Sequence, residues 1–216
     1  MATAERATSR APGIDRRAFW LRRLHSLTGV VPIGLYVIVH IGINSFAASG
    51  SDVYDRVAHF LESLPYLIAI EIPFIWLPIL YHSLYGIYIH ATGRANPLQY
   101  PYPNNTMYSI QRWSGIVTLV FIGWHFWQTR LANYIHGTPI DFRMMAEIFA
   151  DPKWVIFYAI GLTAVAFHLA NGMRTFMLTW GIVVGDHARG AMAKAVAVFG
   201  ALFLAVSLAA IWAFTR

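Results

Sequence analysis

The sequence predicts an all-helical integral membrane protein, on two observations. The 216-residue chain is 57% apolar and only 12% charged, which is more apolar and less charged than an ordinary soluble domain. Five stretches are each long enough to cross roughly 30 Å of hydrocarbon as an α-helix. They lie near residues 24–46, 66–90, 111–134, 154–178 and 192–214. We therefore expect one five-helix transmembrane domain over residues 21–216, preceded by a flexible cytoplasmic tail at residues 1–20.

The chain contains no cysteine. This excludes disulfides, iron–sulfur ligation, zinc–thiolate sites and the thioether attachment of a c-type haem. Any cofactor must be held by other side chains.

The distribution of basic residues predicts the orientation in the membrane, because Lys and Arg next to spans favour the cytoplasmic side. With the N-terminus inside, eleven of the 16 basic residues lie on the inner side and five on the outer side. We therefore expect a cytoplasmic N-terminus and, after an odd number of spans, a C-terminus outside. The net charge of +6 is then an insertion signal and a surface for cytoplasmic partners and anionic lipid, and does not indicate nucleic-acid binding.

Four histidines fall inside the predicted spans, one in each of the first four: His40, His82, His125 and His168. A strongly polar side chain at membrane depth is costly and by default indicates a functional site. A single such histidine is equally well explained by an interhelical hydrogen bond. Four at matched depths favour a shared function.

The depths of these histidines predict how they pair. With a rise of about 1.5 Å per residue and alternating helix directions, His40 and His125 each lie about 4 to 5 Å outside the bilayer midplane. His82 and His168 lie about 4 to 5 Å inside it. The sequence therefore predicts two bis-histidine sites stacked along the membrane normal.

Haem fits such sites better than zinc does. Two axial imidazoles fill the axial positions of a haem iron and favour electron transfer over ligand binding, whereas zinc would require four ligands at one depth. We therefore expect two b-type haems whose irons are bound by the four histidines. Haem propionates are anionic, so basic residues at the rims are candidate partners, although each could equally be an interfacial arginine whose charge reaches water. The inner candidates are Arg22, Arg23, Arg112 and Arg174, and the outer one is Arg130.

Glycines recur at fixed offsets from the histidines. In the second and fourth spans, Gly86 and Gly172 follow the histidine by four residues, about one helical turn, so each is expected on the same face and to leave space for a flat macrocycle. In the first and third spans, Gly29 and Gly115 precede the histidine by eleven and ten residues. The alternative is close helix packing through small residues, which does not explain the offsets.

Several short runs between about Arg22 and Gly185 carry a family resemblance. They are Arg22-Arg-Leu-His-Ser26 with Gly29, Leu61-Glu-Ser-Leu-Pro65, Leu77-Pro-Ile-Leu-Tyr-His82 with Gly86-Ile-Tyr88, Gln111-Arg-Trp-Ser-Gly115, Trp124-His125 with Thr129-Arg130, and His168 with Asn171-Gly172. Together they resemble the di-haem cytochrome b subunit of succinate dehydrogenase and fumarate reductase. That family has five helices, with one haem held from the first and third and the other from the second and fourth.

The resemblance implies partners that the residues alone do not indicate: a flavoprotein subunit, an iron–sulfur subunit and a quinone, commonly menaquinone, at a bacterial cell membrane. The inner haem would face the iron–sulfur subunit and the outer haem would communicate with quinone. No set of catalytic residues for succinate chemistry is visible, so dehydrogenation is expected on a partner chain.

Quinone chemistry needs protons, which makes Glu62 and Glu71, at the start of the second span, candidates near the outer haem. The alternative is an interfacial carboxylate or a helix N-terminal charge. His25, inside the first matching run, is a candidate for a quinone or a propionate, or else an interfacial basic residue.

Three other functions remain possible from the sequence. A cytochrome b subunit of a hydrogenase or formate dehydrogenase would share the His-x-x-x-Gly pattern, but the Arg22–Ser26 and Leu61–Pro65 runs argue against it. A transporter using a histidine relay should show inverted repeats around a midplane site. A haem-free anchor would leave four buried histidines unexplained.

Overall fold

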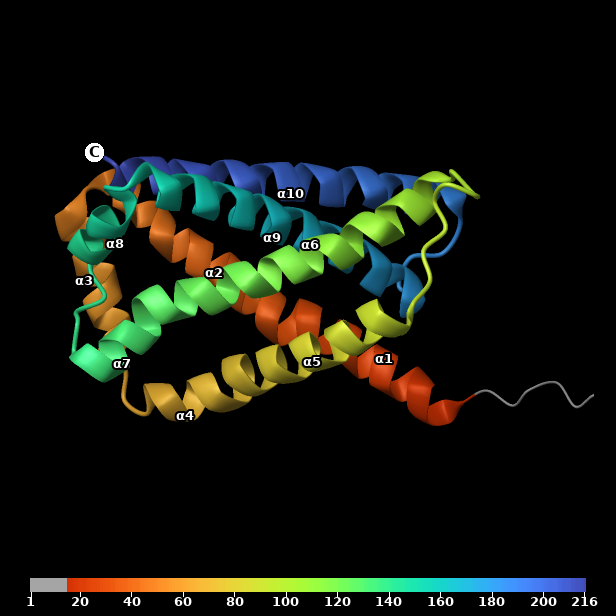
Figure 1. The fold of residues 1–216 in the computed structure, drawn as a ribbon, viewed down its shortest axis with the longest axis horizontal. Helices are drawn as coiled ribbons and strands as arrows, with labels where there is room; N and C mark the ends of the chain where they lie inside the picture. The colour runs from red at the N-terminus through yellow and green to blue at the C-terminus, as the bar shows by residue number, and fades with distance from the viewer. Residues whose placement is uncertain (1–14) are drawn as a thin grey trace, which may run out of the picture.

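In the computed structural model, which describes residues 15–216, the chain folds into α-helices joined by turns, with no strand among those residues. By length and composition, four of its helical runs could cross a membrane: Arg16–Ser49, Leu67–Thr92, Pro152–Thr179 and Asp186–Phe214. A further long run, from Pro103 to His136, lies alongside them (Figure 1). Residues 1–14 of the expected tail lie outside the described part.

The first three long runs are each interrupted by a π-helical turn. They consist of α1 (Arg16–Thr28), η1 (Gly29–Gly34), α2 (Leu35–Asn44) and η2 (Ser45–Ser49); of α4 (Leu67–Glu71), η3 (Ile72–Trp76) and α5 (Leu77–Thr92); and of α6 (Pro103–Phe126), η4 (Trp127–Leu131) and α7 (Ala132–His136). Pro32 and Pro73 lie within η1 and η3. A π turn accommodates a residue without an N–H while the helix continues past it.

The first helix begins earlier than its apolar stretch. The Asp15 carboxylate accepts hydrogen bonds from the backbone N–H groups of Arg17 (3.0 Å) and Ala18 (3.2 Å), which caps the helix at Arg16. Residues 16–20, which we expected in a flexible tail, are therefore helical. Hydropathy indicates only the part of a helix that lies in the membrane, and this helix extends beyond that part into a polar, arginine-rich turn.

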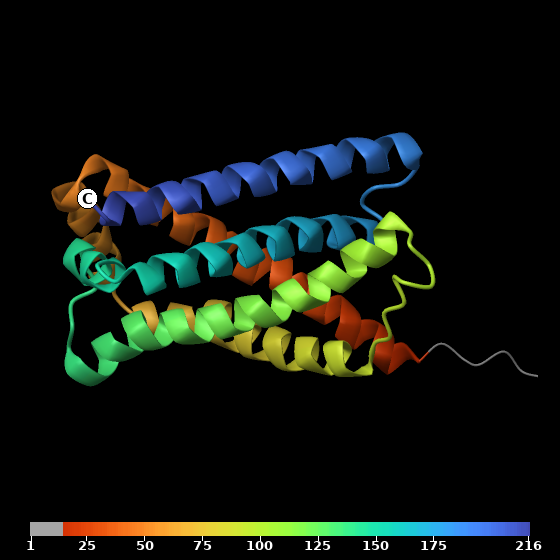
Figure 2. The same ribbon diagram turned by 45° about the horizontal axis from the view of Figure 1, so that its top comes forward.

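Helix α9 (Pro152–Thr179) is the centre of the bundle and lies between α6 and α10 (Asp186–Phe214) (Figure 2). Its buried side chains include Leu162, Val165, Ala166 and Leu169. By contrast, the first two runs leave large apolar side chains exposed, among them Leu35 at 61% and Leu84 at 60%. In a membrane this apolar surface faces lipid, which is why it needs no protein cover.

Two short helices, α3 (Ser51–Glu62) and α8 (Phe142–Phe149), close the end of the bundle at which the C-terminus lies (Figure 1). Tyr54 packs edge-on against Phe142 and Phe214, with ring centroids 6.1 and 5.0 Å apart. The Phe142 N–H donates to the Asp55 carboxylate at 2.7 Å. Burial, together with neighbouring carboxylates, raises the pKa of the Tyr54 phenol to about 12. This end of the bundle is thus closed by an aromatic cluster and by one hydrogen bond to a carboxylate.

Replacing Gly161 with alanine should destabilise the α6–α9 contact. A Cβ at Gly161 would collide with the Phe121 ring, whereas a Cβ at Gly123 would meet nothing within 4 Å. Overpacking of this kind costs about 1–3 kcal/mol. We expect Gly161→Ala to lower the thermal unfolding midpoint in detergent and Gly123→Ala, the matched control, to leave it unchanged or slightly raised. Equal midpoints for the two variants would contradict the contact.

Candidate functional site

The four intramembrane histidines lie in two facing pairs. The ring centroids of His40 and His125 are 5.8 Å apart, with an interplanar angle of 71°. Those of His82 and His168 are 6.1 Å apart, with an angle of 89°. The structure thus brings together the two pairs that the depth calculation predicts.

The two pairs lie toward opposite ends of the bundle. His82 contacts His25 of α1, because its Nδ1 is 2.9 Å from the His25 carbonyl oxygen. His40 is linked to the other end through Asn44, whose side-chain oxygen accepts from the Tyr54 hydroxyl of α3 at 3.5 Å. Helix α1 lies at one end of the molecule and α3 at the other (Figure 1). We call the two sets the inner pair (His82, His168) and the outer pair (His40, His125).

Backbone carbonyls orient both rings of the inner pair. The His82 Nδ1–H donates to the His25 carbonyl, and His168 Nδ1 lies 3.1 Å from the Gln111 carbonyl oxygen. The Gln111 side-chain nitrogen also lies 3.2 Å from His168 Nδ1, a contact that would require the opposite tautomer. We assign the proton to Nδ1, because the Gln111 backbone carbonyl can only accept and is the nearer of the two partners. The Gln111 amide nitrogen donates to the His168 carbonyl at 3.0 Å, and its oxygen accepts from Asn171 at 2.8 Å.

Side chains orient the rings of the outer pair. His125 Nδ1 lies 3.2 Å from the Tyr158 hydroxyl, which donates its own proton to the Gln128 side-chain oxygen at 3.3 Å. The phenol oxygen therefore accepts from His125 Nδ1–H. For His40, the Asn44 amide nitrogen lies 3.4 Å from Nε2, and an amide nitrogen only donates. The Asn44 nitrogen also donates to the His40 carbonyl at 2.8 Å. For His82, His125 and His168, the partners at Nδ1 favour a proton on that nitrogen, which leaves the lone pair on Nε2.

The glycines do not serve the histidines that we expected. A Cβ at Gly29 would collide with the His82 ring, and one at Gly115 would lie 2.9 Å from His168 Cε1. Both glycines therefore make room for inner-pair rings that belong to another helix. Gly86 instead faces His25 Cε1, at 3.3 Å from an added Cβ. The spacing of a glycine from the histidine of its own span does not give this partner, which depends on how the helices face one another.

Gly172, the fourth of these glycines, has the Gln111 side-chain nitrogen as its nearest neighbour, 3.6 Å from an added Cβ. It therefore faces the residue that orients His168, and not the His168 ring. Two residues that orient the inner pair, Gln111 and Asn171, were not among the expected site residues. Asn171 lies three residues after His168 on the same helix, whereas Gln111 begins the predicted third span, so depth did not connect it with His168.

The inner arginines make contacts that we did not expect. Arg112 donates to the carbonyls at the end of α5, Ile89 at 3.3 Å, Gly93 at 3.0 Å, and His90, and so stabilises that helix terminus. Arg23 stacks over Phe19 and Trp180, with the guanidinium carbon 5.0 and 5.2 Å from the ring centroids. Arg174 donates to Asn104 at 3.0 Å, and Arg22 is exposed. Their role toward propionates stays a prediction.

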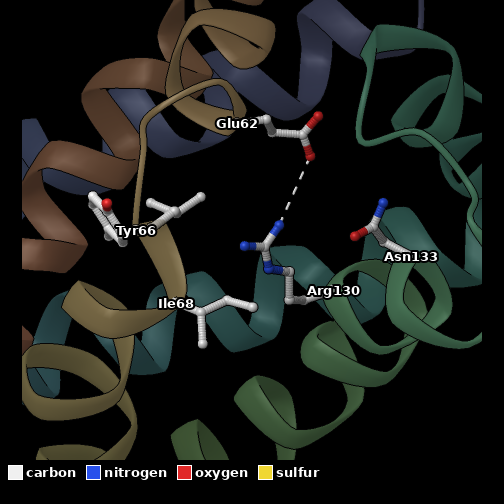
Figure 3. A pocket seen from close by; sticks show the side chains of 6 residues that line it. Glu62, Tyr66, Ile68, Arg130 and Asn133 are labelled. Atoms are coloured by element: carbon white, nitrogen blue, oxygen red, sulfur yellow. Dashed lines mark ion pairs between the residues drawn. The ribbon is translucent and has the colours of Figure 1, made fainter.

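The outer arginine, Arg130, joins both predicted carboxylates beside a cavity of about 430 Å³ (Figure 3). It pairs with Glu71 at 2.7 Å and with Glu62 at 3.8 Å. The Tyr134 hydroxyl donates to the second Glu71 oxygen at 3.3 Å. The cavity is lined by Glu62, Tyr66, Leu67, Ile68, Arg130 and Asn133.

Tyr66, at the rim of this cavity, has a φ of 61°, in the left-handed region that a residue with a side chain seldom adopts. Such strain often accompanies binding sites. His25, the third quinone candidate, is not here. It stacks on His82, with ring centroids 4.0 Å apart and planes inclined by 10°, and its buried Nδ1 has no hydrogen-bond partner among the described residues.

Long apolar helices that carry buried imidazoles in facing pairs define the class of this protein as a multi-pass membrane subunit suited to a redox cofactor. Residues 98–209 match the family of the succinate dehydrogenase/fumarate reductase transmembrane subunit. The chain is also 41% identical over 198 residues to the succinate dehydrogenase cytochrome b558 subunit of Bacillus subtilis (strain 168), covering 92% of this chain and 98% of the relative.

The chain therefore belongs to the succinate dehydrogenase/fumarate reductase transmembrane subunit family. The resemblance noted from the sequence is confirmed, and with it an all-helical, multi-pass membrane subunit of an oxidoreductase complex. Membership favours this function over the hydrogenase-type and transporter alternatives.

Removing the Arg130 charge should destabilise the outer end. The Arg130 and Glu71 side chains are only 18% and 13% exposed, and losing a charged hydrogen bond there costs about 1.5–3 kcal/mol. We expect Arg130→Gln to lower the unfolding midpoint and the double variant Arg130→Gln/Glu71→Gln to recover part of the loss, because no unpaired carboxylate remains at that position. Adding Glu62→Gln instead should recover less, since its contact is longer. Additive effects of Arg130→Gln and Glu71→Gln would show that the two do not interact.

Proposed function

We propose that this chain carries electrons between the soluble subunits of a succinate:quinone oxidoreductase and a membrane quinone, through two b haems each held by one histidine pair. The observation that carries the proposal is the set of two facing imidazole pairs, in which His82, His125 and His168 each have a hydrogen-bond partner at Nδ1. The Bacillus subtilis relative is named as a cytochrome b558 subunit, which supports b haem as the cofactor.

The spacing of the pairs fits an iron held between them. A metal–imidazole nitrogen bond is about 2 Å, so the two rings of each pair would have room to hold one iron between them. The observed distances between ring centroids are 5.8 Å for His40 and His125 and 6.1 Å for His82 and His168. Haem, when bound, supplies an iron that takes up and releases one electron.

The protein side chains would do the positioning. Hydrogen bonds at Nδ1 fix the tautomer and the rotation of His82, His125 and His168, and second-shell partners of this kind raise the basicity of a metal-bound imidazole. Each histidine pair would hold one haem iron, and a haem held by two histidines suits electron transfer. In this proposal His40 and His125 hold the outer haem, and His82 and His168 the inner one.

The orientation proposed from the charge distribution gives each end a partner. The arginine-rich start of α1 would face the cytoplasm and the C-terminus the outside, with α6 counted as a fifth span. The inner pair would then receive electrons from an iron–sulfur subunit joined to a flavoprotein, on which succinate would be oxidised. This chain would take no direct part in that oxidation.

The cavity beside Arg130 is the proposed quinone site. It lies at the end of the bundle where α3, α4 and α7 meet, and its lining combines the carboxylate of Glu62 with apolar side chains such as Leu67 and Ile68. Glu71 and Glu62 are both within reach of Arg130, so a proton released by a quinol, for example menaquinol, would have carboxylate acceptors. His25 is at the inner pair, and there it would serve a propionate and not this quinone.

Haem content tests the histidine assignments. We expect two b haems per wild-type chain by pyridine-haemochrome analysis, and one haem in each of the variants His40→Ala and His82→Ala. His136→Ala is the matched control, because His136 is exposed at the end of α7, and it should retain both haems. A wild-type chain without haem would overturn the proposal.

Quinone turnover tests the cavity. In the assembled complex, Glu71→Gln should lower electron transfer to a menaquinone analogue tenfold or more, as expected when a group that accepts a proton is lost. Reduction of a soluble dye by the soluble subunits should be unchanged. Glu147→Gln is the control, because that residue pairs with Arg143 on the exposed surface of α8. Unchanged quinone turnover in Glu71→Gln would exclude this role.

A further inference from the structure

The inner and outer pairs differ in what accepts the hydrogen bonds of their rings. Both inner rings donate to backbone carbonyl oxygens, those of His25 and Gln111. The acceptor for His125, in the outer pair, is the side-chain oxygen of Tyr158, at 3.2 Å. His168 Nδ1 also lies 3.4 Å from the Ser114 hydroxyl, which donates to the Gln111 carbonyl at 3.0 Å. A backbone carbonyl is present whatever the residue type, so each inner ring keeps a carbonyl acceptor, whereas the acceptor described for His125 depends on the identity of one side chain.

Tyr158 is held firmly in place. It is 3% exposed, and its ring packs edge-on against Phe121 and Phe149, with centroids 5.2 and 4.9 Å away. Its hydroxyl donates to the Gln128 side-chain oxygen at 3.3 Å. Because the phenol proton is used in that bond, the oxygen can only accept from His125.

Gln128 comes three residues after His125 on the same helical run and lies in the π-helical turn η4 (Trp127–Leu131). The hydrogen bonds thus lead from His125 to the phenol of Tyr158 on α9, and from that phenol back to Gln128. These two hydrogen bonds restrict the rotation of the imidazole about its Cβ–Cγ bond.

We propose that Tyr158 is a positioning residue for the outer haem, which sets the tautomer and rotation of His125 and lowers the reduction potential of the outer iron. The proposal rests on the proposed function, in which His125 binds that iron. A hydrogen bond accepted from Nδ1–H strengthens the electron donation of Nε2. Stronger donation stabilises the oxidised iron more than the reduced iron, so losing the acceptor raises the potential.

The test is a redox titration of the b-haem absorbance of the purified holo-complex carrying Tyr158→Phe, which keeps the packed ring and removes only the hydroxyl. We expect two haems, with the potential of the outer haem shifted to a more positive value and that of the inner haem unchanged. The haem that remains in His40→Ala identifies which step of the redox titration belongs to the inner haem. The low-spin ferric signal in electron paramagnetic resonance should change for the outer haem alone.

Tyr81→Phe is the matched control. Its hydroxyl also makes a hydrogen bond, to the Leu21 carbonyl at 2.9 Å, but not to a histidine, so neither potential should move. Gln128→Leu provides a second variant in which the phenol remains and becomes a weaker acceptor. We expect a positive shift of the outer potential smaller than that of Tyr158→Phe, and this variant decides the matter if Tyr158→Phe fails to assemble.

The outcomes separate the two proposals. Two haems with an unchanged outer potential in Tyr158→Phe, or in Gln128→Leu if the first variant does not assemble, would overturn the role of Tyr158 and leave the proposed function intact. An equal shift of both potentials would also overturn it, because it would indicate a general change in the bundle. Absence of haem from the wild type would overturn the proposed function itself.

Discussion

A polar nitrogen inside a bilayer must find its partner within the protein, since the hydrocarbon offers none. Each imidazole in this bundle has two ring nitrogens, and the chain supplies partners mainly for one of them: carbonyls for His82 and His168, and a phenol for His125. Once Nδ1 is committed in this way, Nε2 is left with a lone pair. The helix contacts that make these bonds, α1 with α5 and α6 with α9, are also the contacts that build the bundle. The geometry of the histidine pairs and the packing of the helices therefore depend on the same hydrogen bonds.

The fold class and the pairing of the histidines could be predicted from the sequence, because both follow from one coordinate, the depth of a residue along a helix of known rise. The residues that contact each imidazole ring could not be predicted from the sequence. Which glycine lies against His82, or which side chain meets His125, depends on the rotation of each helix about its own axis, and neither hydropathy nor depth gives that angle. Gly29 and Tyr158 are therefore recognised only in the structure.

The third long run illustrates a related limit. By length and composition, four of the described helical runs qualify as membrane spans, and the run from Pro103 to His136 is not among them. It carries Gln111, His125, Gln128 and Arg130, which hold or orient site residues in other helices. The polar groups that make this run central to the site are the same groups that lower its hydropathy, so composition alone understates it.

The order of the four histidines along the chain has a consequence for biosynthesis. Along the chain, the helix that carries His82 comes between those that carry His40 and His125, which face each other. In the same way, the helix that carries His125 comes between those that carry His82 and His168. The two pairs are therefore interleaved, and neither can form within a single hairpin. As the chain emerges from the ribosome, the outer pair becomes complete only with α6 and the inner pair only with α9. The outer and the inner histidine pairs are therefore completed at different stages of synthesis.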